Sequence, residues 1–149
     1  MVVLGCDKAG SEWLPELSAV LNEMGLENEI LFDGTADGCD YTDAAFLVAE
    51  TVASGKAEKG ILVCGTGIGM SIAANKVRGI RASVCNDCYS AAMTVVHNKS
   101  NILCMGARVM GIELAKKIVE NYFSATFEAG GRHERRVTAI IAKEREQLQ

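Results

Sequence analysis

Short apolar segments alternate along the chain with longer segments of helical periodicity. The apolar segments are four or five residues long, rich in Val, Ile, Leu and Cys, and lack a clean alternation of polar and apolar positions. They comprise 2–6, 29–32, 60–64, 81–85 and 101–105. Short runs of this kind are typical of strands buried on both faces of a parallel sheet. The sequence therefore predicts five parallel strands.

Between these segments, apolar residues recur three or four positions apart, which is the spacing of one helix face. The predicted helices cover 13–24, 45–52, 69–77, 87–98, 115–123 and about 132–147. Ser11 is the expected N-cap of the first helix and Gly25 its end. Strands that alternate with helices favour right-handed crossovers and helices on both faces of the sheet. We expect one doubly wound α/β domain over 1–149, with an additional C-terminal helix.

Composition and charge narrow the possible functions. The chain has 149 residues, 49% of them hydrophobic, and a formal net charge of -4. An acidic protein is poorly suited to nucleic acid, because binding requires a basic face that neutralises phosphates. No apolar run approaches the roughly 20 residues of a membrane span. The first residues lack the basic segment of a secretory signal. We expect a cytoplasmic protein that binds neither nucleic acid nor membrane.

Six cysteines suggest a reduced protein. Cys6, Cys64, Cys85 and Cys104 lie in predicted strands, where a reduced cysteine acts as a small hydrophobic residue. Cys85 and Cys88 have CxxC spacing, but no second pair and no nearby histidine completes a zinc site. We expect no metal and no disulfide. A thiol redox protein that uses Cys85 and Cys88 remains an alternative.

A glycine-rich loop follows the third predicted strand and precedes a predicted helix. Its sequence, CGTGIGMS over 64–71, allows successive backbone amides to face one concavity at a helix N-terminus, where anions bind. The dinucleotide pattern GxGxxG fails, because Met70 and Ile72 occupy the positions of its third glycine. The loop therefore indicates an anion site. A non-catalytic module that binds nucleotides or sugar phosphates remains an alternative.

Cys64 directly precedes this loop. Amide donors at a helix N-terminus stabilise a thiolate, which acts as a nucleophile or as a general base in enzymes. A cysteine that only packs at the end of a strand fits the same position. The residues alone leave both interpretations open.

Basic residues near the C-terminus suggest phosphate binding. Arg132 and Arg136 are four positions apart and share one face of the last predicted helix. Positive charge is unfavourable at a helix N-terminus, and paired guanidiniums suit the oxygens of a phosphate monoester. Arg108 follows the last strand and is a further cation. His97, at the end of a predicted helix, is either a partner of the helix dipole or a catalytic group.

Taken together, these motifs resemble the ribose-5-phosphate isomerase B family, which includes the subunits of galactose-6-phosphate isomerase. The resemblance covers nearly the whole chain in order. The motifs are GCDKAG at 5–10, CGTGIGMSIAANK at 64–76, GIRA at 79–82, YSA at 89–91, HN at 97–98, GARV at 106–109 and GRH at 131–133.

The resemblance implies a Rossmann-like three-layer sandwich with a five-stranded parallel sheet. It also implies a homodimer or homotetramer with active sites between subunits, in which the helix at about 132–147 packs on the partner. The implied reaction interconverts an aldose phosphate and a ketose phosphate, with no cofactor and no metal. Ribose 5-phosphate is the expected substrate.

The resemblance also assigns roles to individual residues. Cys64 resembles the base that moves a proton between C1 and C2, whereas Thr66 and His97 resemble residues that assist ring opening and proton transfer between the sugar oxygens. The amides of 65–69 would hold the enediolate oxygen, and His97, Asn98 and the arginines would reach across from the partner. The implied substrate contacts are Asp7, Lys8, Tyr41, Gly65, Gly67, Ile68, Gly69, Asn98, Arg108, Arg132 and Arg136.

Two departures from the family pattern bear on the substrate. Lys8 stands where the family usually has histidine, and Thr42 and Asp43 follow Tyr41 where it usually has Pro-His. Lysine is a point charge without an acceptor at neutral pH. Galactose or allose 6-phosphate and a tetrose phosphate therefore remain alternatives.

Overall fold

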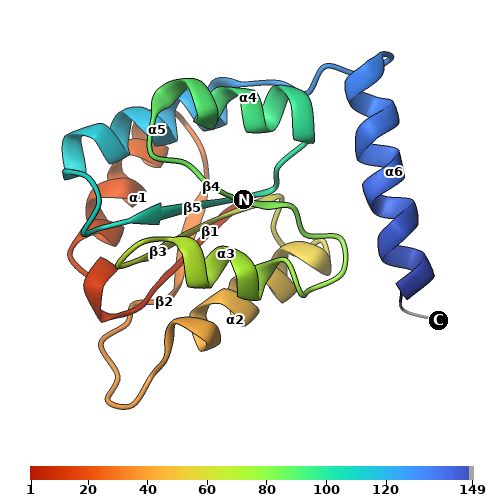
Figure 1. The fold of residues 1–149 in the computed structure, drawn as a ribbon. Coiled ribbons are helices and arrows are strands. Elements are labelled where there is room, and N and C mark those ends of the chain that lie inside the picture. The colour runs from red at the N-terminus through yellow and green to blue at the C-terminus, as the bar shows by residue number, and fades with distance from the viewer. Residues whose placement is uncertain (148–149) are drawn as a thin grey trace.

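The computed structural model describes residues 1–147, and its central layer is a five-stranded sheet (Figure 1). The strand order is β2-β1-β3-β5-β4, and every adjacent pair is parallel. The strands are β1 (Val2–Cys6), β2 (Asn28–Phe32), β3 (Lys59–Cys64), β4 (Ala82–Val84) and β5 (Ile102–Gly106). The five predicted parallel strands are confirmed.

Helices cover both faces of this sheet, as predicted. They are α1 (Trp13–Glu23), α2 (Tyr41–Ala53), α3 (Ile68–Ala74), α4 (Cys88–Asn98), α5 (Ile112–Ser124) and α6 (Arg132–Gln147), with a short 3₁₀ helix η1 (Lys8–Gly10). One core cluster lies under α1, α4 and α5, and a second lies under α2 and α3. The fold is therefore the expected three-layer α/β sandwich with a C-terminal helix.

Successive strand residues supply the two clusters alternately. In β5, Leu103 and Met105 face α1, α4 and α5, whereas Ile102 and Cys104 face α2 and α3. This is the two-residue period of a strand with apolar layers on both sides. The continuous apolar runs in the sequence have this origin.

Two predictions from the sequence are wrong in detail. The strands β2 and β4 form the edges of the sheet and are only partly buried, with Ile30 37% exposed. Ser11 does not cap α1, because it closes η1 and its Oγ donates to the Lys8 carbonyl at 3.1 Å. The helix α1 begins two residues later, at Trp13.

The helix α6 stands beside the sandwich (Figure 1). It lies at the opposite end of the molecule from the end toward which β5 points. Only His133 and Val137 are buried along it. Near its other end, Glu144 Oε1 accepts a hydrogen bond of 3.0 Å from the Gly79 amide. Within residues 1–147, no helix combines the length and hydropathy needed to cross a bilayer.

Candidate active site

The carboxyl ends of the strands bring together the loops that the sequence analysis selected. All neighbouring strands are parallel, so the segments after β1, β3 and β5 emerge at the same edge of the sheet, where α/β proteins bind ligands. Asp7 follows β1, the glycine loop follows β3, and Arg108 follows β5. The topology therefore places these three segments side by side.

The glycine loop is fixed against the end of β5. The Ala107 amide donates to the Cys64 carbonyl at 2.8 Å, and the Arg108 amide donates to the Gly65 carbonyl at 3.0 Å. A Cβ added at Gly106 would lie 2.7 Å from the Thr66 Cα. Glycine at 106 thus permits the close approach of the two backbones that holds the loop in place.

Cys64 lies at the base of this loop with its sulfur facing a backbone donor. Its Sγ accepts a hydrogen bond from the Gly67 amide at 3.1 Å, and the residue keeps 5% of its surface exposed. Gly67 is the N-cap of α3, has a φ of 79° and offers no side-chain cap. The first turn of α3 thus presents backbone donors beside the sulfur.

The other buried thiols, which lie in the strands or directly after them, have different surroundings. Burial raises the pKa of Cys6 to about 12, with Asp7 and Asp33 adding to the effect. Burial and then Asp87 raise the pKa of Cys85 to about 11. Burial also raises the pKa of Cys104 well above its usual value. These three thiols remain protonated at neutral pH and serve as core residues.

Further predicted site residues surround the glycine loop. A Cβ added at Gly65 would lie 3.5 Å from the Arg108 Nη1, so this guanidinium covers Gly65. The ring of Tyr41, at the start of α2, covers Gly69 in the same way, because a Cβ there would lie 2.8 Å from Tyr41 Cε2. Thr66 is exposed, and its Oγ1 accepts from the amide of the exposed Ile68 at 3.2 Å.

Asp7 and Lys8 lie on the turn that follows β1. Asp7 Oδ1 accepts a hydrogen bond of 2.9 Å from the Ala9 amide and thereby caps η1. Lys8 is the first residue of η1 and is exposed. The backbone of Asp7 also packs closely against Gly34, whose φ is 72°. The turn is therefore held from both sides, and the Lys8 side chain is free to meet a ligand.

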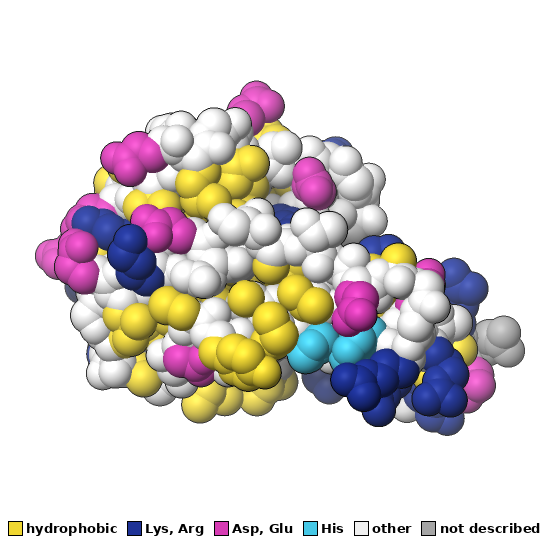
Figure 2. Space-filling view, turned by 90° about the horizontal axis from the view of Figure 1, so that it is seen from above, with side chains coloured by type: hydrophobic (Ala, Val, Ile, Leu, Met, Phe, Trp, Pro, Cys, Tyr) yellow, Lys and Arg dark blue, Asp and Glu magenta, His cyan; other side chains and the backbone are white. Residues whose placement is uncertain are grey.

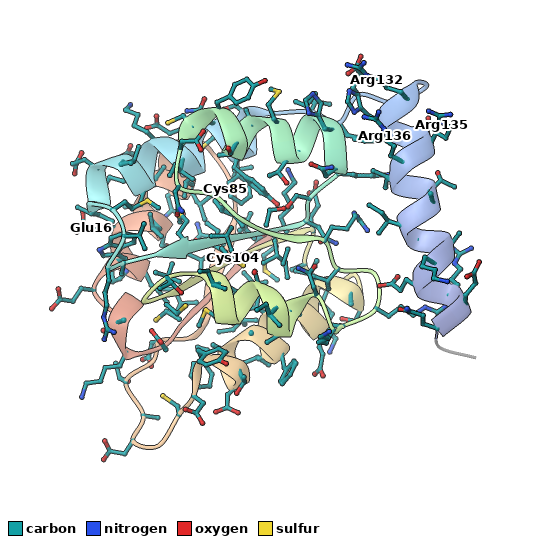
Figure 3. All side chains as sticks on the ribbon, viewed as in Figure 1. Glu16, Cys85, Cys104, Arg132, Arg135 and Arg136 are labelled. Carbon is teal, nitrogen blue, oxygen red and sulfur yellow. The ribbon has the colours of Figure 1, made fainter. Side chains whose placement is uncertain are left out.

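The remaining predicted residues form a second group at the other end of the sheet. His97 and Asn98 end α4, whereas Arg132 and Arg136 begin α6. Figure 3 shows these two arginines on the first turns of α6, and Figure 2 shows the histidines beside basic side chains. Because α4 returns antiparallel to the strands, its end lies far from their carboxyl ends. One chain does not bring the two groups together.

His133 is not among the predicted site residues, although it lies in the GRH motif. Its ring is stacked on His97, with the centroids 4.1 Å apart and the ring planes inclined by 10°. A signal was present in the sequence, because His133 stands between Arg132 and Arg136 on the first turns of the helix. Periodicity alone could not show which residue it contacts.

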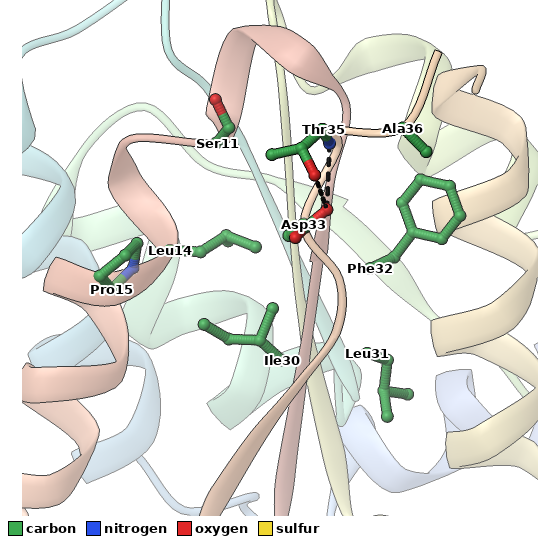
Figure 4. A pocket seen from close by; sticks show the side chains of 9 residues that line it. All are labelled: Ser11, Leu14, Pro15, Ile30, Leu31, Phe32, Asp33, Thr35 and Ala36. Carbon is green, nitrogen blue, oxygen red and sulfur yellow. Dashed lines mark hydrogen bonds between the residues drawn. The ribbon is translucent and has the colours of Figure 1, made fainter. Parts of the chain in front are cut away.

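A cavity of about 700 Å³ lies beside the edge strand β2, and none of its lining residues is a predicted site residue (Figure 4). Its lining is largely apolar, with Asp33 as its one acidic side chain. Asp33 Oδ1 accepts from the Thr35 amide at 3.0 Å and from its hydroxyl at 2.8 Å. These bonds lower the pKa of Asp33. Both hydrogen bonds to Asp33 Oδ1 thus come from Thr35, within the same turn of the chain.

Comparison with known proteins identifies the family. The model of the family described as "Ribose/Galactose Isomerase" matches residues 2–140. Ribose-5-phosphate isomerase B of Escherichia coli strain K12 is 48% identical over 145 residues, which cover 96% of this chain and 95% of the relative. A D-erythrulose-4-phosphate isomerase of Pectobacterium atrosepticum is 41% identical, with 87% and 86% covered.

A solved structure agrees with this result over almost the full length. Ribose-5-phosphate isomerase B of Mycoplasma genitalium, determined with bound ribulose 5-phosphate, has a TM-score of 0.91 and 35% identity, and the match covers 97% of this chain and 96% of that one. Fold, motif order and sequence identity thus point to the same assignment. The chain belongs to the ribose/galactose isomerase family and is a sugar-phosphate aldose–ketose isomerase of the ribose-5-phosphate isomerase B type.

Proposed function

We propose that this chain interconverts D-ribose 5-phosphate and D-ribulose 5-phosphate, with Cys64 as the base. The observation that carries this proposal is the 3.1 Å hydrogen bond between Cys64 Sγ and the Gly67 amide, at the first turn of α3. The Escherichia coli relative carries the name of this activity, and the Mycoplasma genitalium structure holds ribulose 5-phosphate. Both support ribose 5-phosphate as the substrate.

In the proposed reaction, the Cys64 thiolate removes a proton from the carbon next to the carbonyl of the open sugar. The electron pair moves onto the carbonyl oxygen and forms an enediolate, and the thiol then returns its proton to the neighbouring carbon. The backbone amides of Gly65, Gly67, Ile68 and Gly69 are the proposed donors to the enediolate oxygen. Removing one such donor typically costs about 2.7–4 kcal/mol. Thr66 and His97 are proposed to open the ring and to shift a proton between the sugar oxygens.

The proposed site needs two copies of the chain. The family resemblance implies that all three arginines reach across from the partner, but Arg108 lies over Gly65 of its own chain, on the Cys64 side. His97, Asn98, Arg132 and Arg136 lie at the opposite end of the sheet. We infer a homodimer, or a homotetramer built from it, in which this second group reaches the glycine loop of the partner subunit. The position of α6 beside the sandwich, with few buried side chains, supports this arrangement.

Arg136→Ala should raise KM for ribose 5-phosphate by about tenfold or more, because it removes a charge-assisted hydrogen bond to the phosphate. The effect on kcat should be smaller, since the phosphate is remote from the reacting carbons. Arg135→Ala is the matched control, because Arg135 is the adjacent exposed arginine on α6. Steady-state kinetics on the three proteins measure the difference. An unchanged KM for Arg136→Ala would remove Arg136 from the phosphate site.

A panel of sugar phosphates tests the substrate. We expect the highest kcat/KM with ribose 5-phosphate, compared with erythrulose 4-phosphate, allose 6-phosphate and galactose 6-phosphate. The tetrose phosphate is the second candidate, since the Pectobacterium atrosepticum relative carries that name and is 41% identical. A higher kcat/KM with the tetrose phosphate would make it the proposed substrate in place of ribose 5-phosphate. The proposed reaction type would not change.

Lys8→His should change the relative preference among these sugars by about tenfold or more, because a point charge is exchanged for a ring that can accept a hydrogen bond. Lys8 is exposed next to Asp7 on the turn after β1, so folding should tolerate the change. The same panel provides the measurement. An unchanged order and ratio of kcat/KM values would show that Lys8 does not select the sugar.

A further inference from the structure

The stack between His97 and His133 joins α6 to the end of α4. The ring centroids are 4.1 Å apart and nearly parallel. His133 keeps only 7% of its surface exposed and is, with Val137, one of the two buried residues of α6. His97 is half-buried in the last turn of α4. The stack thus involves one of the two buried side chains of α6.

The segment that leads into α6 reinforces this junction. The Glu128 amide donates to the Val96 carbonyl at 3.0 Å, and the Lys99 ammonium lies 5.4 Å from the centroid of the Phe127 ring. His133 Nε2 lies 3.5 Å from the Glu128 carboxylate. These contacts hold the start of α6 against the C-terminal turn of α4.

Burial and the neighbouring cationic groups favour a neutral His133. Burial and then His97, from α4, lower the pKa of His133, and Arg132 and Arg136 on α6 act in the same direction. Glu128, from the preceding segment, raises it. Two cationic rings at this separation would also repel each other. His97 therefore faces a neutral ring rather than a second cation.

We propose that His133 is a positioning residue that orients the His97 ring for proton transfer and couples it to the phosphate-binding start of α6. The inference rests on the proposed function, because it requires the proposed roles of His97 and of the arginines. Arg132 precedes His133 directly and Arg136 follows three residues later. A single stack thus sets the orientation of the proton-transfer ring and the position of both guanidiniums. A displacement of about 1 Å at such a group can cost about 10²-fold in rate.

His133→Ala should lower kcat by about tenfold or more and also raise KM for ribose 5-phosphate, because it releases both His97 and the start of α6. His133→Phe retains a flat ring in the stack and should keep kcat within about threefold of the wild type. Arg135→Ala removes an exposed side chain from the same turns of α6 and should change kcat by less than about twofold. Steady-state kinetics measure all three, and a His133→Phe variant as slow as His133→Ala would overturn the proposal.

A double-mutant cycle separates positioning from general structural damage. If His133 acts through His97, His133→Ala should lower kcat by less than about twofold in a His97→Ala background. An equal loss of kcat in both backgrounds would overturn the positioning role and leave the proposed function standing. If His97→Ala alone leaves kcat unchanged, the proposed role of His97 fails, and this inference fails with it.

Discussion

Cys64→Ala is expected to lower kcat by about 10³-fold, the middle of the range for a general base in proton transfer. The reaction moves a proton between two carbons, and alanine has no group that accepts it. The residue is nearly buried and its sulfur accepts a single hydrogen bond, from Gly67. Its removal should therefore leave the fold intact. Sugar phosphate should still raise the melting temperature of the variant, because the proposed phosphate and hydroxyl contacts lie on other residues.

Two further cysteine variants sharpen this test. Cys64→Ser keeps an acceptor for the Gly67 amide but does not ionise near neutral pH, so its kcat should stay close to that of Cys64→Ala. Cys88→Ala is the matched control, because Cys88 is a partly buried cysteine at the start of α4. It should retain wild-type kcat, and its full activity would also exclude a redox mechanism through Cys85 and Cys88. Normal turnover by Cys64→Ala would refute Cys64 as the base.

The central strands of the sheet were predictable because their burial is visible within short stretches of the sequence. In β1, β3 and β5 nearly every residue is buried, and short runs of Val, Ile, Leu and Cys carry that signal directly. The edge position of β2 and β4 depends on strand order, which periodicity does not encode. The N-cap of α1 was missed because η1 takes up Ser11 before the helix begins.

The local geometry of the candidate site was predictable where its parts are continuous in sequence. Gly67 adopts a left-handed conformation at the start of α3. The glycine pattern of the loop indicates a backbone of this kind, because glycine adopts it without steric cost. The stack of His97 on His133 joins residues 36 positions apart, and neither residue type nor spacing indicates it. The separation of Cys64 from Arg132 and Arg136 follows from the direction of α4, which is a property of the three-dimensional fold.

Exposed apolar side chains support the assembly of two chains. Ile68 and Ile72 on α3 and Ile140 on α6 are each more than half exposed. Apolar side chains of this size are favourable at protein interfaces. Those on α3 lie beside the glycine loop, and Ile140 lies on the helix that begins with the proposed phosphate ligands. An interface that covers both would bring the two groups of site residues together.

Mixing two inactive variants is therefore expected to restore activity. Chains with Cys64→Ala and chains with His97→Ala should each be nearly inactive, but a mixed dimer contains one site with Cys64 from one chain and His97 from the other. If the two variants pair at random, about half of the dimers are mixed. Each mixed dimer has one intact site and one inactive site, so the refolded mixture should regain about a quarter of wild-type activity. Cys64→Ala mixed with Arg108→Ala is the control, because Arg108 lies over Gly65 in the same chain as Cys64. Differently tagged chains, unfolded and refolded together, allow mixed dimers to be purified and assayed. Mixed dimers of the first pair without recovered activity would show that His97 does not complete the site of its partner.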